Sequence, residues 1–121
     1  MGQIITRQTL TSPDFDWQQL RQLAGGDSAF EYELLEMFLQ DAQQSLQALE
    51  QAIAARSLQT IQDVAHSLKG ASANVGASAL AIAARQLEQI AHGEQLTEAP
   101  NILQQIRMHC AHIQLHLQTR Q

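Results

Sequence analysis

Apolar residues recur every three or four positions along most of this chain, and the positions between them are mainly polar. This period matches the turn of an α-helix and predicts amphipathic helices that each bury one face. The first long helix should begin at a cap, Asp27 or Ser28, and run to about Ala55. Its apolar positions are Leu34 or Leu35, Phe38, Ala42, Leu46, Leu49 and Ile53.

The same pattern predicts three further long helices. The next one follows Ser57, which can cap it, and should end near Gly76, because glycine tolerates the left-handed conformation of a helix C-cap. Another should span about Ala77 to Ala91. The last should be capped by Thr97, with Pro100 tolerable in its first turn. The three apolar stripes are Leu58, Ile61, Ala65, Leu68 and Ser72; Leu80, Ala83 or Ala84, Leu87 and Ile90; and Leu103, Ile106, Cys110, Ile113 and Leu117.

The segment before the first long helix has a different character. Residues 1–12 show no sustained period and are expected to form an N-terminal arm. Asp14 is a candidate N-cap for a short helix that Gly25 and Gly26 would end. Its apolar residues, expected to cover one end of the core, are Phe15, Leu20 and Leu23. The sequence therefore predicts an all-α fold, an antiparallel up-down four-helix bundle over residues 13–118 with a short extra N-terminal helix.

Composition and charge narrow the classes of protein. A chain of 121 residues that is 45% hydrophobic and 16% charged is expected to fold as one globular domain. The net charge of −5 and the absence of a basic run argue against a nucleic-acid partner. No apolar run approaches the roughly 20 residues of a membrane span, and no signal peptide is apparent. A single cysteine fits a reducing compartment. We expect a cytoplasmic monomer.

The helix after Ser57 carries an unusual group of residues on its polar side. At about 100° per residue, its apolar stripe spans roughly −20° to +60° relative to Ile61, whereas His66 lies near 140°. His66 is therefore predicted to point away from the core. Its neighbours on the helix surface are Gln62, Lys69, Gly70 and Ala73.

This group of residues suits a phosphoryl acceptor. Imidazole is a competent nucleophile near neutral pH. Lys69, three residues after His66, can bring a cation to a group attached to the ring. Glycine inside a helix costs about 0.5–1 kcal/mol relative to alanine, and Gly70 would leave room beside His66 for a bulky group or a partner. An ordinary solvated histidine would show the same spacing, so this alternative stays open on spacing alone.

One run of this helix resembles the signature of histidine-containing phosphotransfer (HPt) domains, which serve in two-component phosphorelays: His66-Ser67-Leu68-Lys69-Gly70, followed by Ser72, Asn74 and Gly76. The resemblance covers roughly residues 14–117. It extends to further positions on the flanking helices: Phe38, Leu46, Leu49, Leu80, Leu87 and Glu88. The fold of that family is a four-helix bundle, which is also the fold that the periodicity predicts.

The resemblance implies a role for each matching residue. The histidine at the position of His66 accepts a phosphoryl group on its outer ring nitrogen from a receiver-domain phospho-aspartate or a kinase. It then passes the group to the aspartate of another receiver. Lys69 would neutralise the phosphate and Gly70 would keep the site open. Glu88 would orient the imidazole, and Gly76 would mark the turn between the two helices of the site.

The implied partners are response-regulator receiver domains, a hybrid sensor histidine kinase, or both. They would dock on the face around His66, where the candidate docking residues are Gln62, Ala73, Val75, Gly76 and Ala77. The chain needs no cofactor of its own, since Mg²⁺ is expected in the receiver. It contains no nucleotide-binding glycine loop. We therefore expect a phosphotransfer intermediate and not an enzyme with kinase activity.

Two alternative functions keep the same fold. The chain could be a helical interaction module that transfers no phosphoryl group, or a fragment of a hybrid sensor or chemotaxis-type kinase. The presence of His66, Lys69 and Gly70 together favours the carrier over the module.

A group of histidines on the last helix is a candidate metal site. His109, His112 and His116 lie within about 60° of one another, and a histidine pair at i, i+4 can bind zinc. No carboxylate or thiolate completes the set, because Cys110 belongs to the core stripe as a small buried hydrophobe. Interaction with the dipole of the helix explains these histidines without a metal. We therefore expect no metal site.

Overall fold

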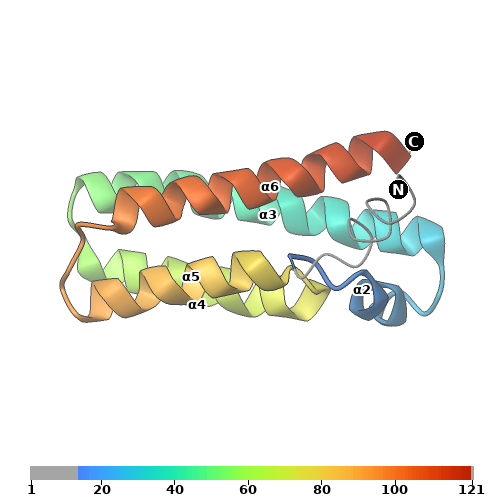
Figure 1. Cartoon of the computed structure of the whole chain (residues 1–121), viewed down its shortest axis with the longest axis horizontal. Coiled ribbons are helices and arrows are strands. Elements are labelled where there is room, and N and C mark those ends of the chain that lie inside the picture. The colour runs from blue at the N-terminus through green and yellow to red at the C-terminus, as the bar shows by residue number, and fades with distance from the viewer. Residues whose placement is uncertain (1–13, 121) are drawn as a thin grey trace, which may run out of the picture.

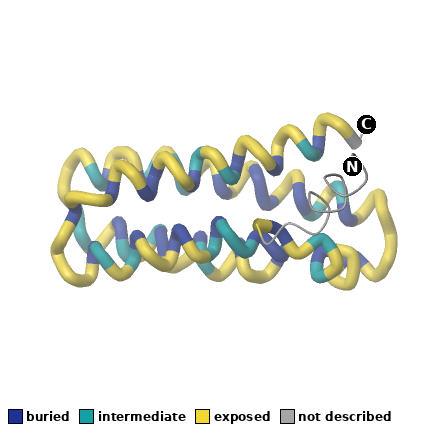
Figure 2. Tube along the Cα trace, in the orientation of Figure 1, coloured by how far each residue is buried: buried dark blue, intermediate teal, exposed yellow. Residues whose placement is uncertain are grey.

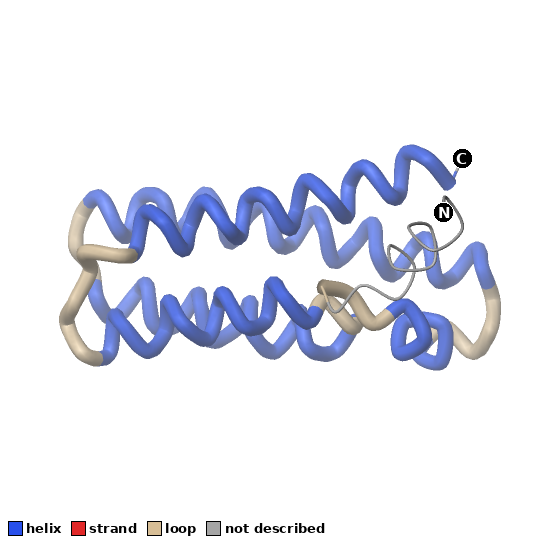
Figure 3. The backbone as a smooth tube through the Cα atoms, in the orientation of Figure 1, coloured by secondary structure: helices blue, strands red, loops and turns tan. Residues whose placement is uncertain are grey.

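The computed structural model describes residues 14–120, and these residues contain helices but no strand (Figures 1 and 3). A short helix, α2, precedes four long ones, and the helices are α2 (Trp17–Leu23), α3 (Ser28–Ala54), α4 (Leu58–Val75), α5 (Ser78–His92) and α6 (Ala99–Arg120). The all-α prediction is confirmed. The predicted arm, residues 1–12, lies outside the described residues, and α6 continues past residue 118.

The four long helices form an antiparallel bundle. In Figure 1, α3 runs from right to left, α4 returns, α5 goes back, and α6 returns again above α5. Short loops make these connections (Figure 3). The buried positions face inward from all four helices (Figure 2), and most of them are leucine, isoleucine or alanine. Small and aliphatic side chains let the helices pack closely, so the low aromatic content of the chain is consistent with this core.

The predicted helix boundaries are confirmed where the local chemistry is unambiguous. Asp27 caps α3, since its carboxylate accepts a hydrogen bond from the backbone N–H of Phe30 at 3.1 Å. Gly76 ends α4 with φ of 94°. Ser57 occupies the predicted N-cap position of α4, but its hydroxyl contacts that of Thr60 and makes no capping hydrogen bond to a backbone N–H. Pro100 lies in the first turn of α6.

Two predicted caps and one predicted core residue are wrong. Asp16, not Asp14, is the N-cap of α2, because its carboxylate accepts from the backbone N–H of Gln19. Leu23 is 42% exposed and does not cover the core. Thr97 does not cap the last helix, which begins two residues later at Ala99 after a turn. The backbone N–H of Ile102 donates to the carbonyl of Glu98, so Glu98 is where the helical hydrogen bonds begin.

The segment Asp14–Asp16, here called the N-terminal strap, crosses the turn between α4 and α5. The backbone N–H of Asp16 donates to the carbonyl of Gly76 at 2.7 Å, and the N–H of Ala79 donates to the carbonyl of Asp14 at 3.0 Å. Phe15, between them, is buried. The strap therefore fixes the end of the bundle at which α4 ends and α5 begins.

Helix α2 reinforces this attachment. The side-chain amide of Gln19 donates to two carbonyls in the last turn of α4, those of Ala73 and Asn74. These contacts add a donor for two carbonyls at the end of α4, of which that of Ala73 also accepts from the backbone N–H of Gly76. Among residues 14–120, no helix is both long and apolar enough to cross a membrane.

Candidate functional site

His66 projects from the middle of α4 on the side opposite the core. Its side chain is 68% exposed, while Ala65 and Leu68, on the inward side of the same turn, are buried. The prediction that His66 points away from the core is confirmed. An exposed imidazole on a well-packed helix is accessible to a second protein while its backbone stays fixed.

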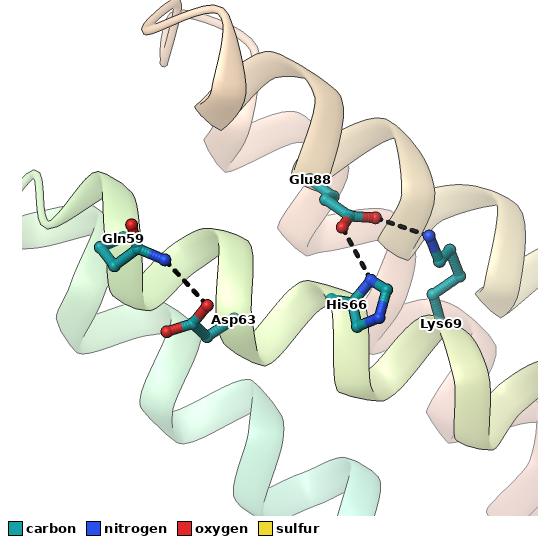
Figure 4. A network of polar contacts seen from close by, with 5 residues as sticks. All are labelled: Gln59, Asp63, His66, Lys69 and Glu88. Atoms are coloured by element: carbon teal, nitrogen blue, oxygen red, sulfur yellow. Dashed lines mark hydrogen bonds and ion pairs between the residues drawn. The ribbon is translucent and has the colours of Figure 1, made fainter.

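The carboxylate of Glu88, on α5, contacts two of the predicted site residues of α4, His66 and Lys69. Glu88 Oε2 lies 2.9 Å from Nδ1 of His66, and Glu88 Oε1 lies 2.8 Å from Nζ of Lys69 (Figure 4). The other ring nitrogen of His66, Nε2, points away from Glu88 (Figure 4). The structure thus brings His66, Lys69 and Glu88 together from positions that lie 19 and 22 residues apart in the chain.

The electrostatics of the site keep Glu88 ionised. The hydrogen bond from Lys69 lowers the pKa of the Glu88 carboxyl from its ordinary value of 4.5, although partial burial opposes this effect, and the hydrogen bond to His66 lowers the pKa further. An ionised carboxylate can only accept hydrogen bonds, so Nδ1 of His66 must be the donor. In the neutral ring the lone pair then resides on the exposed Nε2.

Gly70 lies one turn after His66 and is exposed. A Cβ atom built on Gly70 would meet nothing within 4 Å. Packing within the chain therefore does not require glycine at this helical position, even though alanine would favour the helix. The open space beside His66 is consistent with a role for Gly70 toward a partner.

The candidate docking residues divide into two groups. Ala73 is exposed and Gln62 is half-buried, so both belong to the surface around His66. The prediction is wrong for Val75, Gly76 and Ala77, which are buried. The N-terminal strap lies against Gly76, since a Cβ on Gly76 would lie 2.5 Å from the carbonyl oxygen of Asp16. These three residues pack the end of the bundle.

Sequence reasoning gave no role to Asp63, which lies one turn before His66 on α4. Its carboxylate accepts a hydrogen bond from the side-chain amide of Gln59 at 2.9 Å (Figure 4). In the sequence, only its position three residues before His66 indicates that Asp63 lies near the site. Asp63 places a negative charge one turn before His66 on α4, whereas Lys69 places a positive charge one turn after it.

The histidines of α6 do not act as the trio that the sequence suggested. His116 stacks on Trp17, with ring centroids 3.9 Å apart. His109 and His112 instead lie close to Asp14, with one ligand atom from each of the three residues within 4.8 Å of the others. The prediction that no carboxylate accompanies these histidines is therefore wrong, because the strap brings Asp14 across the bundle.

Cys110 behaves as the sequence predicted. The side chain is buried, and burial raises the pKa of its thiol to about 11. A thiol with this pKa is protonated at neutral pH, so Cys110 serves the core as a small apolar residue.

Comparisons with known proteins agree with this geometry. The family model described as the Hpt domain matches residues 33–116. The crystal structure of histidine-containing phosphotransfer protein B (HptB) from Pseudomonas aeruginosa PAO1 is similar, with 29% identity, coverage of 90% of this chain and 95% of that chain, and a TM-score of 0.83. A candidate histidine-containing phosphotransfer protein from rice has 20% identity, covers 98% of this chain and 86% of that chain, and has a TM-score of 0.80. At that identity, the rice structure supports the fold alone. No curated protein matches the chain.

Proposed function

Because the chain belongs to the Hpt domain family, we propose that it is a phosphoryl carrier in a two-component phosphorelay and that His66 is its phosphoryl acceptor. The observation that carries this proposal is the carboxylate of Glu88, which holds the exposed His66 through Nδ1 and leaves Nε2 facing outward. The printed name of the Pseudomonas protein, a histidine-containing phosphotransfer protein, describes the same class of function.

The transfer step uses the lone pair on Nε2 of His66. This lone pair forms a bond to the phosphorus of a receiver's aspartyl phosphate, while the bond from phosphorus to the aspartyl oxygen breaks and the aspartate leaves as a carboxylate. Nδ1 keeps its proton, so the phosphorylated ring carries a positive charge. Transfer to a second receiver reverses these bond changes and returns the neutral imidazole.

Glu88 stabilises the ring where this charge develops. Its Oε2 accepts from Nδ1 at 2.9 Å, so an anion faces the imidazole before, during and after transfer. A hydrogen bond to a charged group contributes about 1.5–3 kcal/mol, and only the part that strengthens in the transition state increases the rate. Glu88 is therefore a positioning residue that also tunes the charge of the ring.

Lys69 is positioned near His66 by the same Glu88 carboxylate. In the unphosphorylated chain its ammonium contacts Oε1 of Glu88, and its side chain is 33% exposed. Rotation of its flexible stem would bring the ammonium to a phosphoryl group on Nε2 of His66, where it would offset the new negative charge. We infer that, once His66 is phosphorylated, the ammonium of Lys69 alternates between contacts with Glu88 and with the phosphoryl group.

The remaining parts of the reaction belong to the partner. A receiver domain would bring the aspartate and the Mg²⁺, and it would dock over the open space beside Gly70, Gln62 and Ala73. The chain itself would supply no kinase activity. Sequestration of the site by the docked receiver would exclude water and protect the phosphoryl group from hydrolysis.

Transfer between two receivers tests this function. The chain is incubated with a radiolabelled phosphorylated receiver, separated from it, and then mixed with a second, unlabelled receiver. A carrier becomes labelled in the first step and loses the label to the second receiver. A chain that binds receivers without acquiring label would instead be the helical interaction module. A chain that becomes labelled from ATP alone would refute the absence of kinase activity.

A further inference from the structure

Away from His66, the structure brings three metal-binding side chains together from opposite ends of the chain. Asp14 belongs to the N-terminal strap, and His109 and His112 lie one turn apart on α6. One carboxylate oxygen and one ring nitrogen from each histidine all lie within 4.8 Å of one another. We propose that these three residues form a binding site for a divalent transition metal, and that Zn²⁺ is the ion that fits it best.

The donor set favours this class of ion. Two imidazole nitrogens and one carboxylate oxygen suit zinc and its neighbours, whereas Ca²⁺ and Mg²⁺ prefer oxygen ligands alone. Tetrahedral bonds of about 2.0–2.2 Å place ligand atoms roughly 3.3–3.6 Å apart. The three ligand atoms already lie within 4.8 Å of one another, and binding would draw them to these separations by rotation of the side chains. Three protein ligands leave a fourth position for water or for a group from another molecule.

The backbone around the site is already fixed. The carbonyl of Asp14 accepts a hydrogen bond from the N–H of Ala79, and the next residue, Phe15, is buried. Phe15 stacks on Trp17 with ring centroids 3.9 Å apart, and Trp17 in turn stacks on His116 of α6. This row of rings places the strap against α6, so Asp14 and the two histidines need little reorganisation to bind an ion.

A metal here would add a link that the backbone hydrogen bonds do not make. Those bonds tie the strap to the turn between α4 and α5. Coordination by His109 and His112 would tie the same strap to α6, so three elements would meet at one end of the bundle. Binding should therefore stabilise the folded chain, and the stabilisation should rise with the logarithm of the free metal concentration once this exceeds the dissociation constant.

The test is a titration of the full-length, untagged chain with ZnCl₂, followed by calorimetry and by thermal melting. The proposal predicts one Zn²⁺ per chain and a melting temperature that rises with zinc. Asp14→Asn and His112→Asn each remove one ligand at an exposed position and should weaken binding by at least about tenfold, since even loss of an outer-shell partner costs 10–100-fold. His109→Asn removes the half-buried ligand, and the two exposed variants decide the outcome if this variant folds poorly.

His92→Asn is the matched control, because His92 is an exposed histidine on α5 that is not part of the set. It should bind Zn²⁺ as the unaltered chain does. The proposal is overturned if the chain shows no saturable binding of one Zn²⁺. It is equally overturned if Asp14→Asn binds zinc with unchanged affinity, or if His92→Asn loses as much affinity as the ligand variants. None of these results depends on phosphorylation of His66.

Discussion

Glu88 of α5 holds His66 of α4 through a 2.9 Å contact between Oε2 and Nδ1. This contact selects the tautomer of the ring, because an ionised carboxylate can only accept. It also connects His66 to the neighbouring helix, so the position of the imidazole depends on how α4 and α5 pack. The proposed acceptor atom, Nε2, is thereby held on a rigid pair of helices.

Removal of the Glu88 carboxylate should slow phosphoryl transfer. Glu88→Ala removes a charge-assisted hydrogen bond of about 1.5–3 kcal/mol, and only the part that strengthens in the transition state affects the rate, so we expect a decrease of at most about 10–100-fold. Glu88→Gln keeps an oxygen that can accept a hydrogen bond from Nδ1 but loses the charge. Its transfer rate should lie between those of Glu88→Ala and the unaltered chain. The measurement is the transfer rate from a phosphorylated receiver. Glu98→Gln, which changes an exposed carboxylate before α6, should transfer at the original rate. Equal rates for Glu88→Ala and the unaltered chain would contradict this role.

The ion pair of Glu88 should make stability depend on pH in a defined direction. Its pKa in the folded chain is lower than the ordinary value of 4.5, so the unfolded chain binds more protons between the two pKa values. The stabilisation by Glu88 is therefore complete above pH 4.5 and is lost as the pH falls through the lowered pKa. Urea unfolding of the unaltered chain and of Glu88→Gln, from pH 5 down to pH 3, measures this stabilisation. The difference should shrink on acidification, and a difference that grows would count against the ion pair.

Replacement of Gly70 by alanine should raise the stability of the chain but lower the rate of phosphoryl transfer. A Cβ there meets nothing within 4 Å, so Gly70→Ala should stabilise the chain by about 0.5–1 kcal/mol through helix propensity. The same change narrows the space beside His66, and Gly70→Leu narrows it more. We expect transfer to decrease from glycine to alanine to leucine, measured beside urea unfolding. Ala71→Leu places the same side chain on the next exposed residue, about 100° around the helix, and should leave transfer unchanged. Undiminished transfer by Gly70→Leu would refute the proposed access role.

Alanine at Gly76 should have the opposite effect on stability. Gly76 has φ of 94°, and an added Cβ would lie 2.5 Å from the carbonyl oxygen of Asp16. A left-handed backbone costs about 1–2 kcal/mol, and displacement of the strap would lose a hydrogen bond of about 1 kcal/mol. Gly76→Ala should therefore destabilise the chain by about 2–3 kcal/mol in denaturant unfolding. Gly26→Ala is the control, since φ is 82° but no atom lies within 4 Å, and it should destabilise less. Equal losses would exclude the contact with Asp16 as a cause.

The sequence predicted the helices and the exposure of His66 well, for identifiable reasons. Periodic apolar residues define helices with little ambiguity, and the buried positions Leu35, Ile61 and Leu87 follow that period. The angular positions along α4 correctly placed His66 outside the core, because the apolar residues of this helix all fall on one narrow face. The resemblance to HPt domains is confirmed by the match over residues 33–116.

The predictions failed where a long-range contact decided the structure. Asp14 and Asp16 are both chemically suitable caps, and only the hydrogen bonds to Ala79 and Gly76 determine which one begins the helix. The same strap contacts Gly76 and Ala79, and the helical period of α4 carries no sign of these contacts. The approach of Asp14 to His109 and His112 likewise depends on packing between opposite ends of the chain, for which the sequence carries no local signal.

If His66 is the phosphoryl acceptor, the phosphoryl group should be found on its ring after incubation of the chain with a phosphorylated receiver. The label should be acid-labile and base-stable, as a phosphoramidate bond is, and mass spectrometry of the intact phosphopeptides should place it on His66. His66→Gln should acquire no label, while His92→Asn should be labelled normally. A label that persists in His66→Gln, or that resides on another histidine in the unaltered chain, would contradict the account.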